Sequence, residues 1–317
     1  RGGVEPTVTD ANLVLGRLLE NSPLAGGLQL DRAASEEAVA RLAEELDLDL
    51  LACAEGIVRV AEAEMLGAMR VMTLERGIDP RGFALMPFGG AGPLHASALA
   101  SELGISRVLC PRASGVLCAL GLAAAPARRD AAKTVILSGR SLSPERLDRE
   151  RSTLVAQANA MLAGPPARVR IRHELRYSGQ AFELPVEEAI DDGEQTGLLD
   201  PDGLREAFVH IHEQRYGYRD ESADIELVNI RVSVWDAAPT LALLAGRAAN
   251  ASAETGEVVF AGERLRCTVL RGEPAPGSNL EGPMLCALPD STLLIAPGWS
   301  GTVDAHGTIH LDRESEG

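Results

Sequence analysis

Residues 83–95 constrain the fold more than any other part of this sequence, because three kinds of pattern follow one another there. The apolar run from Phe83 to Phe88 has the length of a buried strand. The sequence Gly89-Gly90-Ala91-Gly92 comes next, and a helical pattern begins at Pro93. The apolar positions of that helix are Leu94, Ala98, Leu99 and Leu103. We therefore expect a strand, a tight glycine turn and a helix.

The glycine turn leaves almost no side chains between the strand and the helix. A backbone without side chains can closely approach a flat or phosphorylated ligand, so the turn favours a nucleotide. On this interpretation Gly89, Gly90, Ala91 and Gly92 are the binding residues. The alternative is that the glycines serve packing alone. The spacing is not G-x-G-x-x-G and the chain has no Walker A sequence, so a P-loop is excluded.

Composition limits the kind of protein and its partners. With 317 residues, 45% hydrophobic and 24% charged, the chain has the size of two or three globular domains. A net charge of −16 argues against a nucleic-acid partner, and no apolar run is long enough to predict a membrane span. Five cysteines without a C-x-x-C pair indicate a reducing compartment and no zinc site. We expect a cytoplasmic protein and, because residue 1 is not Met, a part of a longer chain.

The chain divides into three sections by its patterns: residues 1–138, 139–240 and 241–317. In the first section strands alternate with helices, which predicts an α/β fold with a mostly parallel sheet. We expect Ser35 to cap one helix at its N-terminus and a long helix to cover residues 52–76.

The second and third sections have different patterns. Ser143-Pro144 and Asp200-Pro201 predict helix starts in the second section, with strands at residues 169–177, 182–186 and 225–235, so this section is α+β. Residues 237–253 are rich in alanine and are expected to form a linker. The third section has short apolar runs separated by Gly, Pro and Asp turns, which predicts a small all-β domain.

Three polar residues are candidates for catalysis. Asp10 and Asn12 precede an apolar helical stripe, where Asp10 or Thr9 could cap the helix or where the two side chains could face a phosphate-bound metal or the substrate. His95 follows the glycine turn and could polarise a ligand carbonyl or hydrogen-bond a ribose. The alternative for His95 is a structural contact in the first helical turn. No cluster of His, Cys and carboxylates has metal-ligand spacing, so we expect no protein-held metal.

Several long segments carry a family resemblance. Residues 1–18 (RGGVEPTVTDANLVLGRL), 87–95 (PFGGAGPLH) and 108–122 (VLCPRASGVLCALGL) are similar to signatures of the hydantoinase A / 5-oxoprolinase / acetone carboxylase family. Residues 176–180, 216–218, 226–231 and 297–307 look familial as well. The resemblance covers essentially the whole chain, in order.

The resemblance implies an actin-like ATPase (ribonuclease H-like) fold, in which ATP lies between two lobes. Two glycine-rich hairpins hold the phosphates there, and a third glycine motif at a strand-to-helix turn holds the adenosine. Residues 89–92 match the third motif, whereas the chain has no Asp-x-Gly-Gly-Thr pattern for the other two. The chain therefore looks like the C-terminal portion of the ATP-dependent subunit, with α+β and small all-β sections after the ATPase part.

The implied reaction is the ATP-driven opening of a cyclic amide, as in a hydantoin or 5-oxoproline. ATP is the expected cofactor, together with Mg2+ or another divalent ion. The expected partners are the missing N-terminal lobe of the same subunit, a hydantoinase B-type subunit or domain, and the cyclic amide substrate. The alternatives are an ATP-dependent ketone carboxylase subunit and a non-catalytic assembly fragment. Without the phosphate motifs, we expect the isolated chain to be incomplete and inactive as an enzyme.

Overall fold

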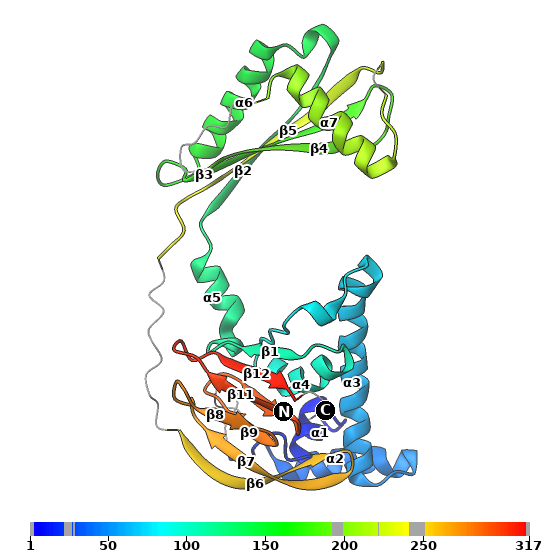
Figure 1. Cartoon of the computed structure of the whole chain (residues 1–317), viewed down its shortest axis with the longest axis vertical. Helices are drawn as coiled ribbons and strands as arrows, with labels where there is room; N and C mark the ends of the chain where they lie inside the picture. Colours follow the sequence, from blue (N-terminus) through cyan, green and yellow to red (C-terminus); the bar gives the residue numbers. More distant parts are fainter. Residues whose placement is uncertain are drawn as a thin grey trace. The chain divides into compact units, whose positions relative to one another are not determined.

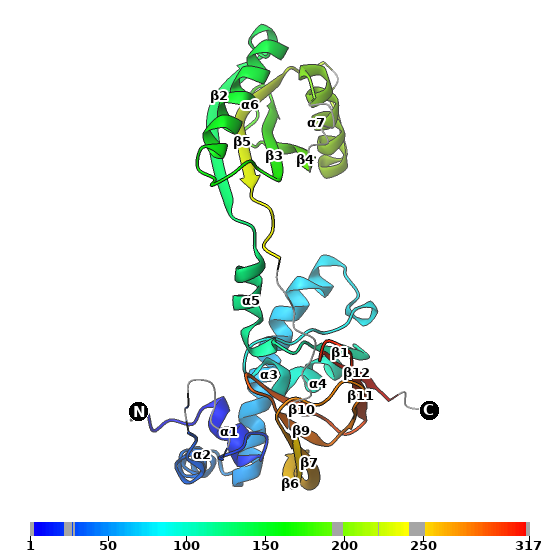
Figure 2. The same cartoon turned by 90° about the vertical axis from the view of Figure 1, so that its left-hand side faces the viewer.

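The computed structural model of the chain describes residues 3–21, 27, 29–191, 199–220, 222–240 and 251–314. These residues form two compact units, each of mixed α/β structure (Figures 1 and 2). Unit 1 combines Arg1–Leu122 with Ala242–Gly317, and unit 2 is Ala123–Leu241. The three sections expected from the sequence differ from this division, because residues 252–313 share sheets and a core with the first section.

The helices of unit 1 are concentrated in its N-terminal part. They are α1 (Val8–Val14), α2 (Arg32–Leu46), α3 (Leu50–Met72), α4 (Gly92–Glu102) and α5 (Leu117–Ala124), with short 3-10 turns at Leu74–Arg76, Pro80–Gly82 and Ser114–Val116. The predicted helix at residues 52–76 corresponds to α3, which ends earlier. The predicted N-cap Ser35 is wrong: Asp31 caps α2 by accepting from the Ala34 N–H, because a cap residue must lie outside the helix whose N–H groups it binds.

Unit 1 contains two four-stranded sheets. One has the order β1 (Arg107–Cys110), β12 (Ile309–Arg313), β11 (Trp299–Val303), β8 (Asn279–Glu281). The other has the order β10 (Thr292–Ile295), β9 (Met284–Ala287), β7 (Glu263–Arg271), β6 (Ser252–Phe260).

The prediction of a mostly parallel sheet in the first section is wrong. Strand β1 pairs antiparallel with β12, from the far end of the chain, and in unit 1 the described parallel pairings are β7 with β9 and a single bridge from Leu85 to Val108. The predicted strand at Phe83–Phe88 is reduced to that bridge. Alternation of helices and strands in a sequence does not specify partners that lie about 200 residues further along.

Unit 2 has one antiparallel sheet and two helices; the sequence predicts both helices and three of the four strands, but not the strand at Arg128–Ser138. The sheet has the order β2 (Arg128–Ser138), β5 (Ile225–Trp235), β3 (Arg168–Tyr177), β4 (Leu184–Asp191). Helices α6 (Pro144–Asn159) and α7 (Pro201–Tyr216) cover the same face of the sheet (Figure 1). The predicted caps are confirmed: Ser143 accepts from the Arg146 N–H and Asp200 from the Gly203 N–H.

Three further expectations have mixed outcomes. Most of the predicted linker, residues 241–250, lies outside the described residues. All five cysteines are free thiols, of which Cys118 is exposed and the other four are buried. Among the described residues, none of the helices is both long enough and apolar enough to cross a membrane.

Candidate functional site

The glycine turn at residues 89–92 is fixed at two points by backbone hydrogen bonds. The Gly89 N–H donates to the Ser114 carbonyl at 2.7 Å, and the Thr292 N–H donates to the Gly90 carbonyl at 3.1 Å. Gly89 has a φ of +84°, a conformation that L side chains rarely adopt. The turn is thus held between the 3-10 turn at Ser114–Val116 and strand β10.

The outer side of the turn is open. Gly90 and Ala91 are exposed, and a Cβ added to Gly90 would have an ordinary contact of 3.6 Å with the Asp290 carbonyl and no closer neighbour. Ala91 is the N-cap of α4 and offers no side-chain acceptor to the first N–H groups of the helix. Protein packing therefore does not explain why residue 90 lacks a side chain, whereas close approach by a ligand would.

The apolar run before the turn is largely exposed, which contradicts its prediction as a buried strand. Phe83 is 60% exposed and Phe88 57%. Leu85 exchanges backbone hydrogen bonds with Arg107 and Leu109 and packs on the core. The segment thus lies along β1, and the exposed Phe88 directly precedes the glycine turn.

His95 does not face the turn opening. Its side chain is 4% exposed, and Nδ1 lies 3.0 Å from Oε1 of Glu62 in α3. This contact joins α4 to α3, directly behind the glycine turn.

Asp10 bonds to groups within unit 1. Thr7, and not Thr9 or Asp10, is the N-cap of α1, and Thr7 and Asp10 form a capping box in which the Thr7 N–H donates to Oδ2 of Asp10 at 2.8 Å. The Ser35 hydroxyl donates to Oδ1 of Asp10 at 2.6 Å. Burial raises the pKa of this carboxyl, but the hydrogen bonds from Ser35 and Thr7 outweigh it, so the pKa is below its ordinary value.

Asn12 is almost completely buried, with 1% of its surface exposed. Its Nδ2 donates to the Val8 carbonyl at 2.9 Å. Its Oδ1 is buried and has no hydrogen-bond partner among the described residues. Asp10 and Asn12 lie two residues apart on α1, so their side chains do not face each other, and the contact of His95 lies between α3 and α4.

A cavity of about 460 Å³ beside α4 was not anticipated from the sequence. Its polar lining includes Arg17, Glu62, Ser97 and Ser101, and Asp10, Asn12 and His95 are not among its lining residues. The Arg17 guanidinium donates to the Val259 carbonyl and lies 5.1 Å from the centre of the Phe260 ring. Burial lowers the pKa of Arg17 more than the nearby Glu62 and Glu55 carboxylates raise it. The lining comes from distant segments, so no local pattern could have shown it.

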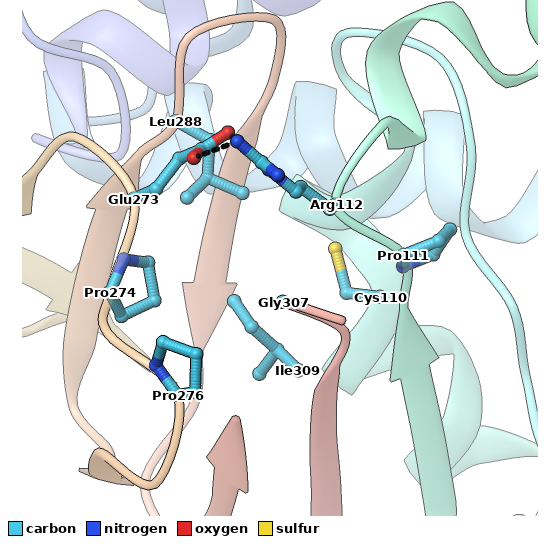
Figure 3. Close-up of a pocket in the computed structure, with 9 residues that line it drawn as sticks. All are labelled: Cys110, Pro111, Arg112, Glu273, Pro274, Pro276, Leu288, Gly307 and Ile309. Atoms are coloured by element: carbon cyan, nitrogen blue, oxygen red, sulfur yellow. Dashed lines mark hydrogen bonds and ion pairs between the residues drawn. The ribbon is translucent and has the colours of Figure 1, made fainter. Parts of the chain in front are cut away.

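A second hollow lies between the adjoining ends of β1 and β12 on one side and residues 273–276 on the other (Figure 3). The Arg112 guanidinium and the Glu273 carboxylate form an ion pair at its rim, with Nη2 and Oε2 2.8 Å apart. Its volume of about 10 Å³ is no larger than one water molecule requires. Burial raises the pKa of the Cys110 thiol in its wall to about 11, so the sulfur is not a reactive thiolate at neutral pH.

Within the described ranges, no group of three or more His, Cys, Asp or Glu side chains is placed to hold a metal ion. A divalent ion at the glycine turn would therefore need ligands other than such a cluster.

Comparison with known proteins identifies relatives along the whole chain. Residues 1–131 match the family described as Hydantoinase/oxoprolinase. An uncharacterized protein of Methanocaldococcus jannaschii is 34% identical over 99% of this chain and 45% of its own length. The caprolactamase subunit alpha of Pseudomonas jessenii is 32% identical over 98% of this chain and 47% of its own length.

Two solved structures are similar to this one. The ATP-dependent caprolactamase of Pseudomonas jessenii matches with a TM-score of 0.70 and 30% identity, covering 98% of this chain and 47% of that one. A nucleotide-free acetone carboxylase matches with a TM-score of 0.76 over 97% of this chain and 46% of that one, and at 21% identity it shows the fold alone. The chain spans about half the length of the curated relatives that it matches.

Proposed function

The chain belongs to the hydantoinase/oxoprolinase family, and from this we propose that it is part of the ATP-dependent subunit of a cyclic amide hydrolase. In this proposal residues 89–92 contact the adenosine of ATP. The observation that carries the proposal is the open backbone at Gly90, where the described residues leave room for a side chain.

The surroundings of the turn support adenosine as the group bound there. Hydrogen bonds from Gly89 and to Gly90 hold the backbone in one conformation, so binding would cost little ordering of the loop. The exposed ring of Phe88 offers an apolar surface to a purine beside the exposed backbone of Gly90.

The phosphates of ATP would bind to residues that are not in this sequence. We propose an actin-like arrangement, in which two glycine-rich hairpins on another lobe hold the phosphates, because the present chain has no Asp-x-Gly-Gly-Thr pattern. The relatives are about twice as long as the matched region, which leaves room for such a lobe. Mg2+ or another divalent ion would then accompany the phosphates.

The chemistry that this proposal implies is activation of an amide. The amide oxygen attacks the γ-phosphorus of ATP and ADP leaves, so that the ring carbon carries an O-phosphate and becomes a better electrophile. Water adds to that carbon, and the carbon–nitrogen bond of the ring breaks as the nitrogen takes up a proton, which leaves an acyl phosphate. A second water hydrolyses the acyl phosphate to a carboxylate and inorganic phosphate. A hydantoinase B-type subunit or domain would take part in this reaction, and the ATP would come from the cytoplasm.

For the three polar residues we propose supporting positions near the site. His95, through Glu62, would fix α4 behind the adenosine turn. Asp10 would fix the start of α1, and the free Oδ1 of Asn12 would accept a hydrogen bond from a group that binds there.

A ketone carboxylase subunit on the same scaffold is the second candidate function. Over nearly the whole chain, identity is 32% to the caprolactamase subunit and 21% to the acetone carboxylase structure, so the amide hydrolase is favoured.

The adenosine turn can be tested by titration calorimetry with adenosine. Gly90→Val adds a side chain where the ligand would lie but meets no close protein atom, and we expect affinity to fall by about tenfold or more. Gly82→Val is the matched control, because a Cβ at Gly82 has no neighbour within 4 Å and is at least as unhindered as one at Gly90. Unchanged affinity in Gly90→Val, or an equal loss in both variants, would remove the turn from the site.

ATP hydrolysis by the chain alone gives an independent test. Because the phosphate-binding residues lie outside this sequence in our proposal, we expect no steady-state release of phosphate above buffer. Sustained turnover by the purified chain would contradict the division of the ATP site.

A further inference from the structure

Within the described residues of unit 2, helices pack against one face of the sheet and none packs against the other. Helices α6 and α7 pack against the side that carries Val169, Ile171 and Leu175, all buried. Because side chains alternate along a strand, Arg170 and Arg172 of β3 point to the opposite side. Both of these arginines are partly exposed.

Arginines from three strands gather on this side around Trp235. The strand register places Arg168 on one side of Trp235 and Arg128 on the other. The guanidinium carbons of Arg128, Arg168 and Arg170 lie 5.2, 5.3 and 5.9 Å from the centre of the indole ring. Three cations over one ring are within the range of cation–π attraction.

Ion pairs hold most of these guanidinium groups in place. Glu187 pairs with Arg170 at 3.7 Å and with Arg172 at 2.5 Å. Arg128 pairs with Asp130 at 2.8 Å. Arg231, on β5, pairs with Glu174 at 2.7 Å. We call the set Arg128, Arg168, Arg170, Arg172, Arg231 and Trp235 the arginine face.

The arginine face retains capacity to bind anions. Among the described residues, three carboxylates pair with Arg128, Arg170, Arg172 and Arg231, and Arg168 has a contact of its own. Each guanidinium has five N–H donors, which is more than one ion pair uses. Between the arginines lies a hollow of about 250 Å³, where the small side chains of Ala132 and Ser233 leave room. Half-exposed arginines around a hollow suit incoming carboxylates, which guanidinium binds in a bidentate manner.

We propose that the arginine face is a docking surface for an acidic segment, rich in Asp and Glu, of a partner polypeptide. The chain as a whole has a net charge of −16, so the positive charge of these arginines is confined to one open face of the sheet. Charge complementarity would orient an acidic segment on this face and would repel it from the rest of the molecule. This proposal concerns unit 2 and does not depend on the adenosine turn of unit 1.

The shape and chemistry of the face favour a polypeptide over other anions. The arginines extend over strands β2, β5 and β3, which is wider than a single small anion needs. Arginine and tryptophan are the residues that most often carry the binding energy of protein interfaces. A nucleic acid would bring a continuous line of phosphates toward a protein of net charge −16.

The proposal can be tested with fluorescein-labelled hexaglutamate and fluorescence anisotropy. We expect the chain to bind this peptide at about 20 mM NaCl and to lose most of the binding at about 300 mM NaCl, because salt screens exposed charges. Arg170→Ser/Arg231→Ser should weaken binding by about tenfold or more. The control Arg140→Ser/Arg149→Ser removes the same charge from exposed arginines outside the face, and its affinity should stay within about twofold of the parent.

Several results would overturn the proposal. These are no binding at low salt, equal losses in the two double variants, or displacement by citrate at the same carboxylate concentration, which would indicate a small-anion pocket. Phenylglyoxal modification with mass spectrometry adds a separate readout. Arg128, Arg170 and Arg231 should react in the free chain and be protected by hexaglutamate. Failure of these arginines to react in the free chain would show that the chain itself covers the face.

Discussion

Two segments of unit 1 resemble family signatures equally well in sequence but have different roles in the structure. In residues 7–12 the side chains of Thr7 and Asp10 bond within the fold, since Asp10 forms a capping box with Thr7 and accepts a hydrogen bond from Ser35. In residues 89–92 the backbone is turned outward, and Gly90 has no close neighbour. The difference teaches that a family signature can mark folding in one place and an open surface in another.

A third segment with the family resemblance, residues 108–122, contains a glycine at which packing leaves no room for a side chain. A Cβ added to Gly115 would lie 1.9 Å from the Asp290 carbonyl oxygen, the same atom that lies 3.6 Å from the Cβ position at Gly90. One turn of the β9–β10 hairpin thus excludes a side chain at residue 115 and tolerates one at residue 90. Urea denaturation, with stability given as the free energy of unfolding, can test each member of this comparison.

Gly115→Ala should have the largest effect on stability. Its methyl group would overlap backbone atoms of Asp290, which cannot rotate away, so we expect a loss of about 3 kcal/mol. A loss below about 1 kcal/mol would show that the hairpin moves easily and that the packing argument is wrong.

Asp10→Ala should be the next most damaging change. It removes the capping box and leaves the Ser35 hydroxyl without its acceptor, and we expect a loss of about 2 kcal/mol at neutral pH. Because the folded pKa of Asp10 is below the ordinary 3.8, its contribution is present above that value and is lost as the pH falls through the lowered pKa. The difference between the variant and the parent should therefore shrink in acid, and a constant difference would argue against an ionised Asp10 as the cause.

Gly89→Ala should have a smaller effect. A Cβ there meets no atom within 4 Å, so the cost is the left-handed backbone alone, about 1 kcal/mol. Gly27→Ala is a control with a φ of +75° and no neighbour within 4 Å. A loss at residue 89 much larger than at residue 27 would point to a contact that the geometry does not show.

Gly90→Val should have the smallest effect, within about 0.5 kcal/mol of the parent. Its side chain has room, and the backbone at residue 90 is not in a left-handed conformation. Stability close to the parent's is what makes the adenosine titration of this variant informative. A large loss of stability would show that packing requires a glycine at residue 90, as it does at Gly115.

The sequence predicts structure well where the determinants are local. Helices α6 and α7 begin where Ser143-Pro144 and Asp200-Pro201 place them, because caps depend on neighbouring residues. Three of the four strands of unit 2 were also found, since alternation along β3 and β5 shows which residues are buried, whereas β2 was not expected.

The sequence fails where partners are distant. Nothing near residue 107 indicates that β1 pairs with Ile309–Arg313, so the expected parallel sheet was wrong. Residues 83–88 have the apolar composition of a buried strand, but the sequence does not show whether another element covers them. In the structure Phe83 and Phe88 are exposed. The cavity beside Arg17 was missed for the same reason, whereas the glycine turn was found because its four residues are consecutive.

The central claim is that adenosine binds at the glycine turn and not in the cavity beside Arg17. Photolabelling with azidoadenosine, followed by mass spectrometry of the labelled residue, tests this most directly. We predict a label within residues 86–92, reduced by excess adenosine and by Gly90→Val. A label on Arg17, Glu62 or Ser97 that adenosine displaces would place the nucleotide in the cavity and contradict the account.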